Sequence, residues 1–237
     1  DLAYVFVALF YVASAGLSIG IAVVGQARPE RLASPMADLR AGVAYVARSA
    51  RIHVLLWIAF LVNLAGLCVT GGLLPVVARD VYGMDELGLG MLVATFAAGA
   101  LVGSLGIATV LRRLSADPVI LYSLVIWHLV LFGFAFIETP TWGIPVLGLI
   151  GLLSSLVMVP LASALIFATD VEYRARVLGL RQLAVVGLPI GLLITGTLVD
   201  VYSVAVALAS VALAGVGAGV WLLLRWAHLV GAQSERS

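Results

Sequence analysis

Long apolar runs alternate with short polar connections along the whole chain. Seven of these runs approach the roughly 20 residues that a helix needs to cross a bilayer. They cover residues 2–24, 54–77, 88–111, 118–137, 144–169, 177–199 and 203–226. The pattern therefore predicts an all-α, polytopic membrane protein with seven transmembrane helices and the lipid bilayer as its main partner.

Composition supports this prediction. Hydrophobic residues make up 63% of the 237 residues, charged residues make up 11%, and the mean hydropathy is +1.19. These values lie outside the range of soluble domains. The net charge is only +1 and no basic stripe is present, so we expect no nucleic-acid partner.

The arginines predict how the chain is oriented. All thirteen basic residues are arginines, and twelve of them fall on one side when the runs are laid end to end. Arg79 falls on the other side. Arginine-rich short connections are typical of the cytoplasmic face, so the N-terminus is predicted to lie outside and the C-terminus in the cytoplasm.

Residues 25–53 form the longest polar connection. Ser34 and Pro35 are typical of a helix start. Apolar residues then recur at helical spacing opposite charged ones, at Leu39, Val43, Val46 and Ala50. The segment predicts an amphipathic helix in the headgroup layer, acting either as a plain linker or as a site for anionic lipid.

The third and sixth runs share a glycine spacing. Gly99 and Gly103 in the third run match Gly187 and Gly191 in the sixth. The two runs cross the membrane in opposite directions, which is the pattern of an inverted repeat. Glycines four residues apart also let helices pack closely in lipid, and such matches arise by chance in glycine-rich helices, so both explanations stay open.

Four stretches resemble the major facilitator superfamily of secondary transporters, in the branch that contains macrolide and enterobactin exporters. They are residues 39–45 with Arg51, residues 73–76, residues 88–104 with Arg112 and Arg113, and residues 174–191. The resemblance implies a six-helix C-terminal bundle of two inverted three-helix repeats, preceded by one extra helix. Its segments are 1–24 (last helix of an N-terminal bundle), 25–53 (cytoplasmic linker), 54–226 (C-terminal bundle) and 227–237 (cytoplasmic tail).

This resemblance also implies a function. Such a protein is a proton-coupled antiporter of a bacterial inner membrane that exports small amphipathic or hydrophobic molecules, such as drugs or siderophores, by alternating access. The missing N-terminal six-helix bundle is then a partner. The alternative is a split or accessory membrane subunit without transport activity of its own.

Other classes of membrane protein find less support. The chain has no lysine, which excludes a retinal Schiff base, and nothing favours a ligand receptor. The histidines are isolated, and the motifs of intramembrane enzymes are absent, so we expect no catalytic centre, cofactor or metal.

By resemblance, the second, third, fifth and sixth runs line the transport cavity. Asn63 leads the candidates because an amide in mid-membrane needs a partner, either the substrate or a neighbouring helix. Further cavity candidates are Thr70, Thr95, Phe96, Ser154, Ser155 and Gln182. Each hydroxyl has a simpler alternative, a hydrogen bond to its own helix.

Three further groups complete the candidate residues. Candidates for gating at the cytoplasmic face are Arg112, Arg113, Arg174, Arg176 and Arg181, which alternatively act as solvated anchors. Candidates for hinges or close packing, where helices are expected to be interrupted, are Gly71, Gly72, Pro75, Gly99, Gly103, Gly187, Pro189 and Gly191. His128 is the deepest titratable group and serves either as a proton relay or in an interhelical hydrogen bond. The acids map to loops or run ends, which assigns any coupling carboxylate to the missing half.

Overall fold

The computed structural model describes the backbone of residues 2–19 and 35–234 and the side chains of 4–18 and 36–226. All elements in these ranges are helical, and they fall into two units, residues 1–35 and 36–237. The first unit contains α1, Leu2–Ile19. Its apolar part, Tyr4–Ser18, is shorter than a full crossing, and the predicted residues 20–24 lie outside the described part.

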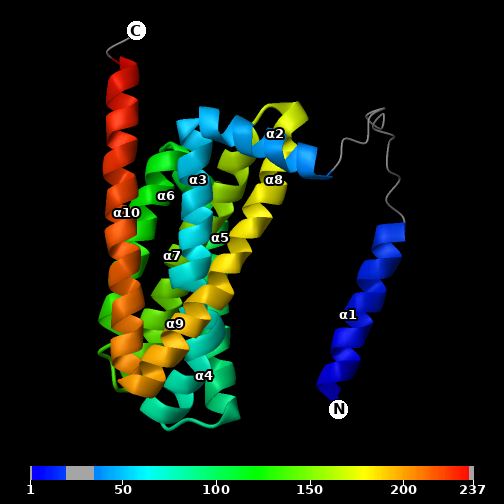
Figure 1. Ribbon diagram of the computed structural model, residues 1–237. Coiled ribbons are helices and arrows are strands. Elements are labelled where there is room, and N and C mark those ends of the chain that lie inside the picture. The colour runs from blue at the N-terminus through cyan, green and yellow to red at the C-terminus, as the bar shows by residue number, and fades with distance from the viewer. Residues whose placement is uncertain (1, 20–34, 235–237) are drawn as a thin grey trace. The chain divides into compact units, whose positions relative to one another are not determined.

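The second unit is a bundle of six helical segments long and apolar enough to cross a membrane (Figure 1). They are Ala50–Val81, α5 (Glu86–Leu111), α6 (Ala116–Phe134), α7 (Pro140–Phe167), Val171–Val201 and Val204–Trp226 within α10 (Val204–Ser234). These segments coincide with the six predicted runs from residue 54 onward. The prediction of an all-α, multi-pass membrane bundle is confirmed.

Local signals set the helix boundaries. Ser49 caps α3 (Ala50–Leu61), because its side chain accepts a hydrogen bond from the backbone N–H of Ile52. Asp85 caps α5 in the same way through Gly88 N, at 3.0 Å. Gly83 has φ of +62°, a left-handed conformation that glycine adopts without strain, and it turns the chain between these two spans.

The first span changes from α-helix to π-helix halfway along. After α3 come the π-helical η1 (Val62–Leu67) and η2 (Val69–Leu73), then α4 (Leu74–Val76) and the π-helical η3 (Val77–Val81). We expected Gly71, Gly72 and Pro75 to interrupt the helix; the span stays helical, and Gly71 and Gly72 lie in its π-helical segment η2. Wider π turns accommodate a local misfit in the hydrogen-bond ladder without breaking the helix.

The fifth span also contains irregular turns. It is made of the 3-10 turn η4 (Val171–Tyr173), α8 (Arg174–Leu183), the 3-10 turn η5 (Ala184–Val186) and α9 (Gly187–Val201). The irregularity expected near Pro189 is this turn η5. Pro189 itself lies in the first turn of α9, where its missing N–H costs no helical hydrogen bond.

The predicted amphipathic helix is α2, Pro35–Arg48, which begins at the predicted proline. Ser34 lies outside the described residues. Of the predicted apolar face, Val46 is buried in the bundle, while Leu39 and Val43 stay exposed. Another face of α2 packs on α8, with Gly42 against the side chains of Arg176 and Leu180.

Both predicted glycine pairs form close helix crossings. A Cβ on Gly99 would overlap the carbonyl oxygen of Gly148 in α7, and one on Gly103 would lie 2.6 Å from the carbonyl oxygen of Leu152. A Cβ on Gly187 would lie 2.9 Å from the carbonyl oxygen of Phe60, and one on Gly191 would overlap that of Leu64.

The two crossings are related by a constant shift of 88 positions, from Gly99 to Gly187 and from Gly103 to Gly191. The partner positions are related by the same shift. Phe60, which meets Gly187, corresponds to Gly148, which meets Gly99. Leu64 corresponds to Leu152 in the same way. A chance match between glycines would not also relate their partners. The inverted repeat is therefore the better explanation of the shared spacing.

Candidate functional site

Two of the six spans are covered least by the rest of the bundle. Only 17% of the most apolar stretch of α5 and 22% of that in Val171–Val201 are buried, against 61% in Ala50–Val81 and 56% in α7. Exposed apolar side chains include Leu101 on α5 and Leu193 on α9. In a membrane protein such a face contacts either lipid or a further bundle.

A pocket lies where α5, the π-helical part of the first span and α9 meet. We call it the α5–α9 pocket, and its volume is about 340 Å³. It is lined by Leu67, Thr70, Gly71, Leu74, Val93, Phe96 and Leu188. The structure thus brings together three residues singled out from the sequence, namely Thr70, Phe96 and Gly71.

The lining of the α5–α9 pocket is apolar and uncharged. The Thr70 hydroxyl donates to the Leu67 carbonyl at 3.5 Å, which leaves its oxygen able to accept a further hydrogen bond. The Phe96 ring, on α5, is half-buried. Such a surface suits a small hydrophobic molecule with at most one hydrogen-bond donor directed at Thr70.

Asn63 makes a different contact from those we expected. Its Nδ2 donates to the carbonyl oxygen of Ala59, one turn earlier in the same span, at 2.8 Å. A half-buried amide in a membrane helix can thus satisfy a donor locally, without a neighbouring helix. Asn63 is not among the residues that line the α5–α9 pocket.

The remaining hydroxyl candidates also bond to their own helices, as the simpler alternative predicted. Thr95 donates to Met91 O at 2.8 Å, Ser154 to Gly151 O at 2.7 Å and Ser155 to Leu152 O at 2.8 Å. Ser154 and Ser155 are buried inside the bundle, so their placement in an open cavity was wrong. The cause for Ser155 is the close α5–α7 crossing, where it lies against Gly103. Gln182 is exposed near the end of α8.

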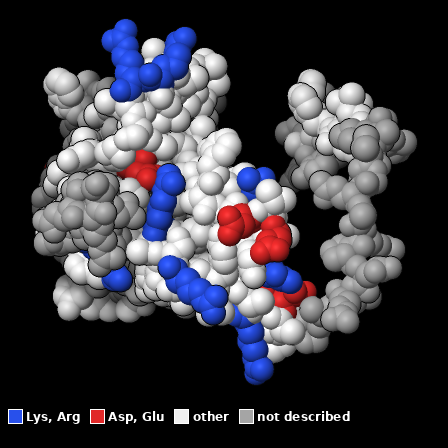
Figure 2. Space-filling model, turned by 90° about the horizontal axis from the view of Figure 1, so that it is seen from above, with Lys and Arg blue, Asp and Glu red and all other residues white. Residues whose placement is uncertain are grey.

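Charged side chains gather at the end of the bundle that carries α2, as Figure 2 shows in a view onto that surface. Arg176 pairs with Asp38 of α2 at 2.7 Å, and Arg51 pairs with Asp117 of α6 at 2.9 Å. The other predicted gating arginines have weaker contacts. Arg174 donates to Thr169 O, Arg112 donates to Thr109, and Arg113 and Arg181 form no ion pair within the described part of the chain.

His128 is fully buried in the bundle. Its Nδ1 lies 2.8 Å from the Leu124 carbonyl of its own helix, so the expected interhelical hydrogen bond is not the one that forms. The ring packs against Gly215 of α10, where any Cβ would overlap it. This packing keeps His128 away from the α5–α9 pocket.

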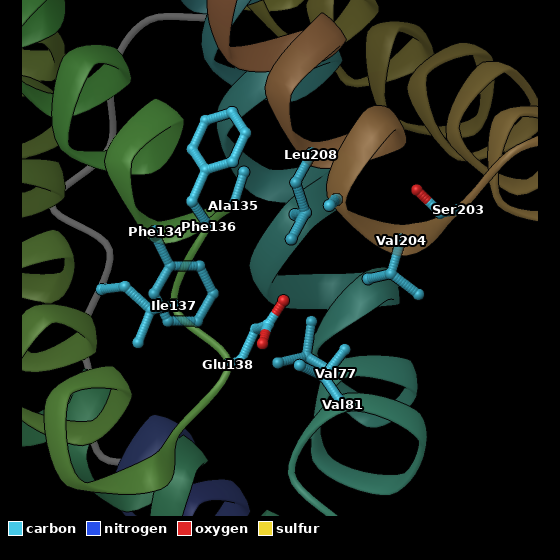
Figure 3. A pocket seen from close by; sticks show the side chains of 11 residues that line it. Val77, Val81, Phe134, Ala135, Phe136, Ile137, Glu138, Ser203, Val204 and Leu208 are labelled. Atoms are coloured by element: carbon cyan, nitrogen blue, oxygen red, sulfur yellow. The ribbon is translucent and has the colours of Figure 1, made fainter.

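A second cavity, of about 300 Å³, lies at the opposite end of the bundle (Figure 3). It is bounded by η3, the loop after α6 and the start of α10. Figure 3 shows the Glu138 carboxylate directed toward the space between Val77 and Leu208. Neither α5 nor α9 contributes to this lining, so the cavity is separate from the α5–α9 pocket. Near it, burial raises the pKa of the Tyr82 hydroxyl, which packs against Gly143.

Sequence reasoning missed four of the seven residues that line the α5–α9 pocket. Leu67 and Leu74 lie three to four residues from Thr70, and Val93 lies three before Phe96. Helical spacing from the predicted polar and aromatic residues would have found them. The ion pairs Arg51–Asp117 and Asp38–Arg176 were also missed, because residues far apart in sequence carry no periodic signal.

Comparison with known proteins agrees with this architecture. A search of curated proteins finds no match. The family model described as transmembrane secretion effector, a group of major facilitator transporters, matches residues 4–234. This covers almost the whole chain, α1 included. Together with the six-span bundle and its repeated glycine crossing, it shows that the chain belongs to the transmembrane secretion effector family of the major facilitator superfamily.

Proposed function

We propose that the chain forms one six-helix half of a bacterial exporter that moves small amphipathic or hydrophobic molecules out of the cell. The observation that supports this best is the α5–α9 pocket, an uncharged site on the least covered face of the bundle. A second six-helix bundle would close this face, and rocking of the two bundles would open the pocket to each side of the membrane in turn.

Orientation follows from the charges. The arginine-rich end would face the cytoplasm, so the N-terminus would lie outside and the C-terminus inside a plasma membrane. We also propose coupling to protons through groups of the second bundle. The acids described in this chain sit at helix ends, for example Asp85 before α5, Asp117 in the first turn of α6 and Asp200 near the end of α9.

Export of fluorescent dyes tests the role of the pocket. A lipophilic cation, a neutral dye and an anion would be followed in cells that carry the chain with its second bundle. Phe96→Ala removes the aromatic wall, and we expect export of at least one dye to fall about three- to tenfold at equal protein level.

The matched control is Phe167→Ala, which removes an exposed phenylalanine at the end of α7, outside the α5–α9 pocket. This variant should export normally. Unchanged export by Phe96→Ala, or an equal loss in both variants, would contradict the role of the pocket.

A further inference from the structure

An apolar groove, separate from the α5–α9 pocket, lies at the arginine-rich end of the bundle. We call it the α2–α3–α8 groove, and its volume is about 430 Å³. Val46 and Ala47 of α2 form one wall, His53 and Trp57 of α3 form the second, and Leu180 and Leu183 of α8 form the third. Helix η5 closes it, while α5, which walls the proposed transport pocket, contributes nothing to this lining.

Specific contacts hold α2 in place as a wall. Asp38 accepts hydrogen bonds from Arg176 Nη2 at 2.7 Å and from Nε at 3.0 Å. Tyr45 donates to Asp170 at 3.1 Å, and its ring stacks on Tyr173 with centroids 4.2 Å apart. Figure 1 shows α2 lying across the ends of α3 and α8. The groove is therefore formed before any ligand binds.

Two arginines neighbour the apolar walls of the groove in the chain. Arg48 directly follows Ala47 on α2, and Arg181 directly follows Leu180 on α8. Neither arginine forms an ion pair with an acid in the described part of the chain. His53, at the start of α3, stacks on Trp57 at the same end. Apolar walls with arginines on the adjoining residues match the acyl chain and the phosphate of a lipid.

We propose that the α2–α3–α8 groove binds an acyl chain of an anionic phospholipid, with Arg48 and Arg181 holding its phosphate. Position supports this occupant, because α2 lies at the end where the spans leave the membrane, at the level of the headgroups. The bound lipid would fill the space between α3 and α8 and fasten α2 to the bundle. Binding is independent of transport, so the result bears on the groove alone.

Trp57 provides the measurement, since it lines the groove and is 49% exposed. The full chain is placed in nanodiscs with either phosphatidylglycerol or phosphatidylcholine carrying brominated acyl chains, which quench tryptophan on contact. The difference between the wild type and Trp57→Phe isolates the signal of Trp57. We expect phosphatidylglycerol to reach half-maximal quenching at a several-fold lower lipid fraction than phosphatidylcholine.

Four variants sharpen the test. Arg48→Gln and Arg181→Gln should each weaken the preference for anionic lipid about fivefold, whereas Arg113→Gln, on the turn after α5, should keep it. Ala47→Phe fills the groove from an exposed position and should reduce quenching by both lipids. Equal quenching by the two lipids in the wild type would indicate ordinary surrounding lipid and overturn the proposal. Absence of quenching would show that protein covers the groove, which also overturns it.

Discussion

The same helix crossing occurs twice between the two repeats of the bundle, with different residues at the contact. In the first, α5 crosses α7, and glycines stand on both sides: Gly99 on α5 meets Gly148 on α7. In the second, α9 crosses the first span, and Gly187 meets Phe60 instead. Glycine lets the backbones approach closely in both crossings, but in the second the partner positions carry the larger side chains of Phe60 and Leu64.

This difference decides where space remains. Gly151 in α7 packs against the Phe96 carbonyl and Ala100 N, and its counterpart in the first span, 88 positions earlier, is Asn63. Both apolar pockets discussed above flank the second crossing. The π-helical turns also lie in the first span, whereas α7 stays α-helical despite Pro145 and Pro160. We infer that the α5–α7 crossing is rigid and that the second crossing accommodates ligands and movement.

The largest effect is expected from adding one methyl group to the rigid crossing. Gly99→Ala would push a Cβ into the Gly148 carbonyl oxygen, which belongs to the backbone and has no room to move. Overpacking of this kind costs about 1–3 kcal/mol or more, so folded yield and melting temperature in detergent should drop sharply. Gly187→Ala should cost less, because its Cβ would lie 2.9 Å from Phe60 O.

Controls exist on the same two helices. Gly106 on α5 and Gly196 on α9 have open space where a Cβ would stand. Alanine at either position should leave the melting temperature unchanged or raise it, since alanine favours helix. The proposed contrast between the crossings would be refuted if Gly99→Ala and Gly187→Ala cost the same.

An intermediate effect is expected at Asn63, the counterpart of Gly151 in the first span. Asn63→Leu removes one hydrogen bond within its own helix, worth about 0.5–1.5 kcal/mol, so the protein should still fold. We predict that it impairs export without lowering abundance. Thr197→Val is the control, because Thr197 also bonds its own helix, at 2.9 Å, but lies exposed on α9. Export at the wild-type rate by Asn63→Leu at equal protein level would remove Asn63 from the candidate residues.

The sequence predicted the spans well and the site in part. Length and hydropathy are properties of each run alone, so all six spans of the bundle, and the start of α2 at Pro35, were found. Side-chain partners depend on which helices become neighbours. For this reason Ser154 and Ser155 were misplaced, and the contact of Asp38 with Arg176 was missed. The π turns were not predicted either, because glycine and proline in a helix indicate an irregularity without specifying its kind.

A smaller effect is expected in the π-helical stretch, where two adjacent glycines have different surroundings. Gly71 lines the α5–α9 pocket with open space at its Cβ position, whereas a Cβ on Gly72 would meet the flexible side chain of Leu192. Gly72→Ala should lower the melting temperature slightly because Leu192 must move. Gly71→Ala should keep the melting temperature but slow export if these turns bend during transport. Normal export by Gly71→Ala would show that the span moves as a rigid helix.

The smallest effect is expected for the ion pair between Asp38 of α2 and Arg176 of α8. Asp38 and Arg176 are both partly exposed, with 42% and 33% of their side chains accessible, so water and salt screen their attraction. A double-mutant cycle with Asp38→Asn and Arg176→Gln should therefore give a coupling of about 0.2–1 kcal/mol in thermal unfolding. The pair Arg51–Asp117 is the comparison, because it joins α3 to α6 and Asp117 is only 13% accessible. Its coupling should be larger and less sensitive to salt. If Asp38–Arg176 proved the stronger pair, side-chain exposure would not set the order of the two couplings.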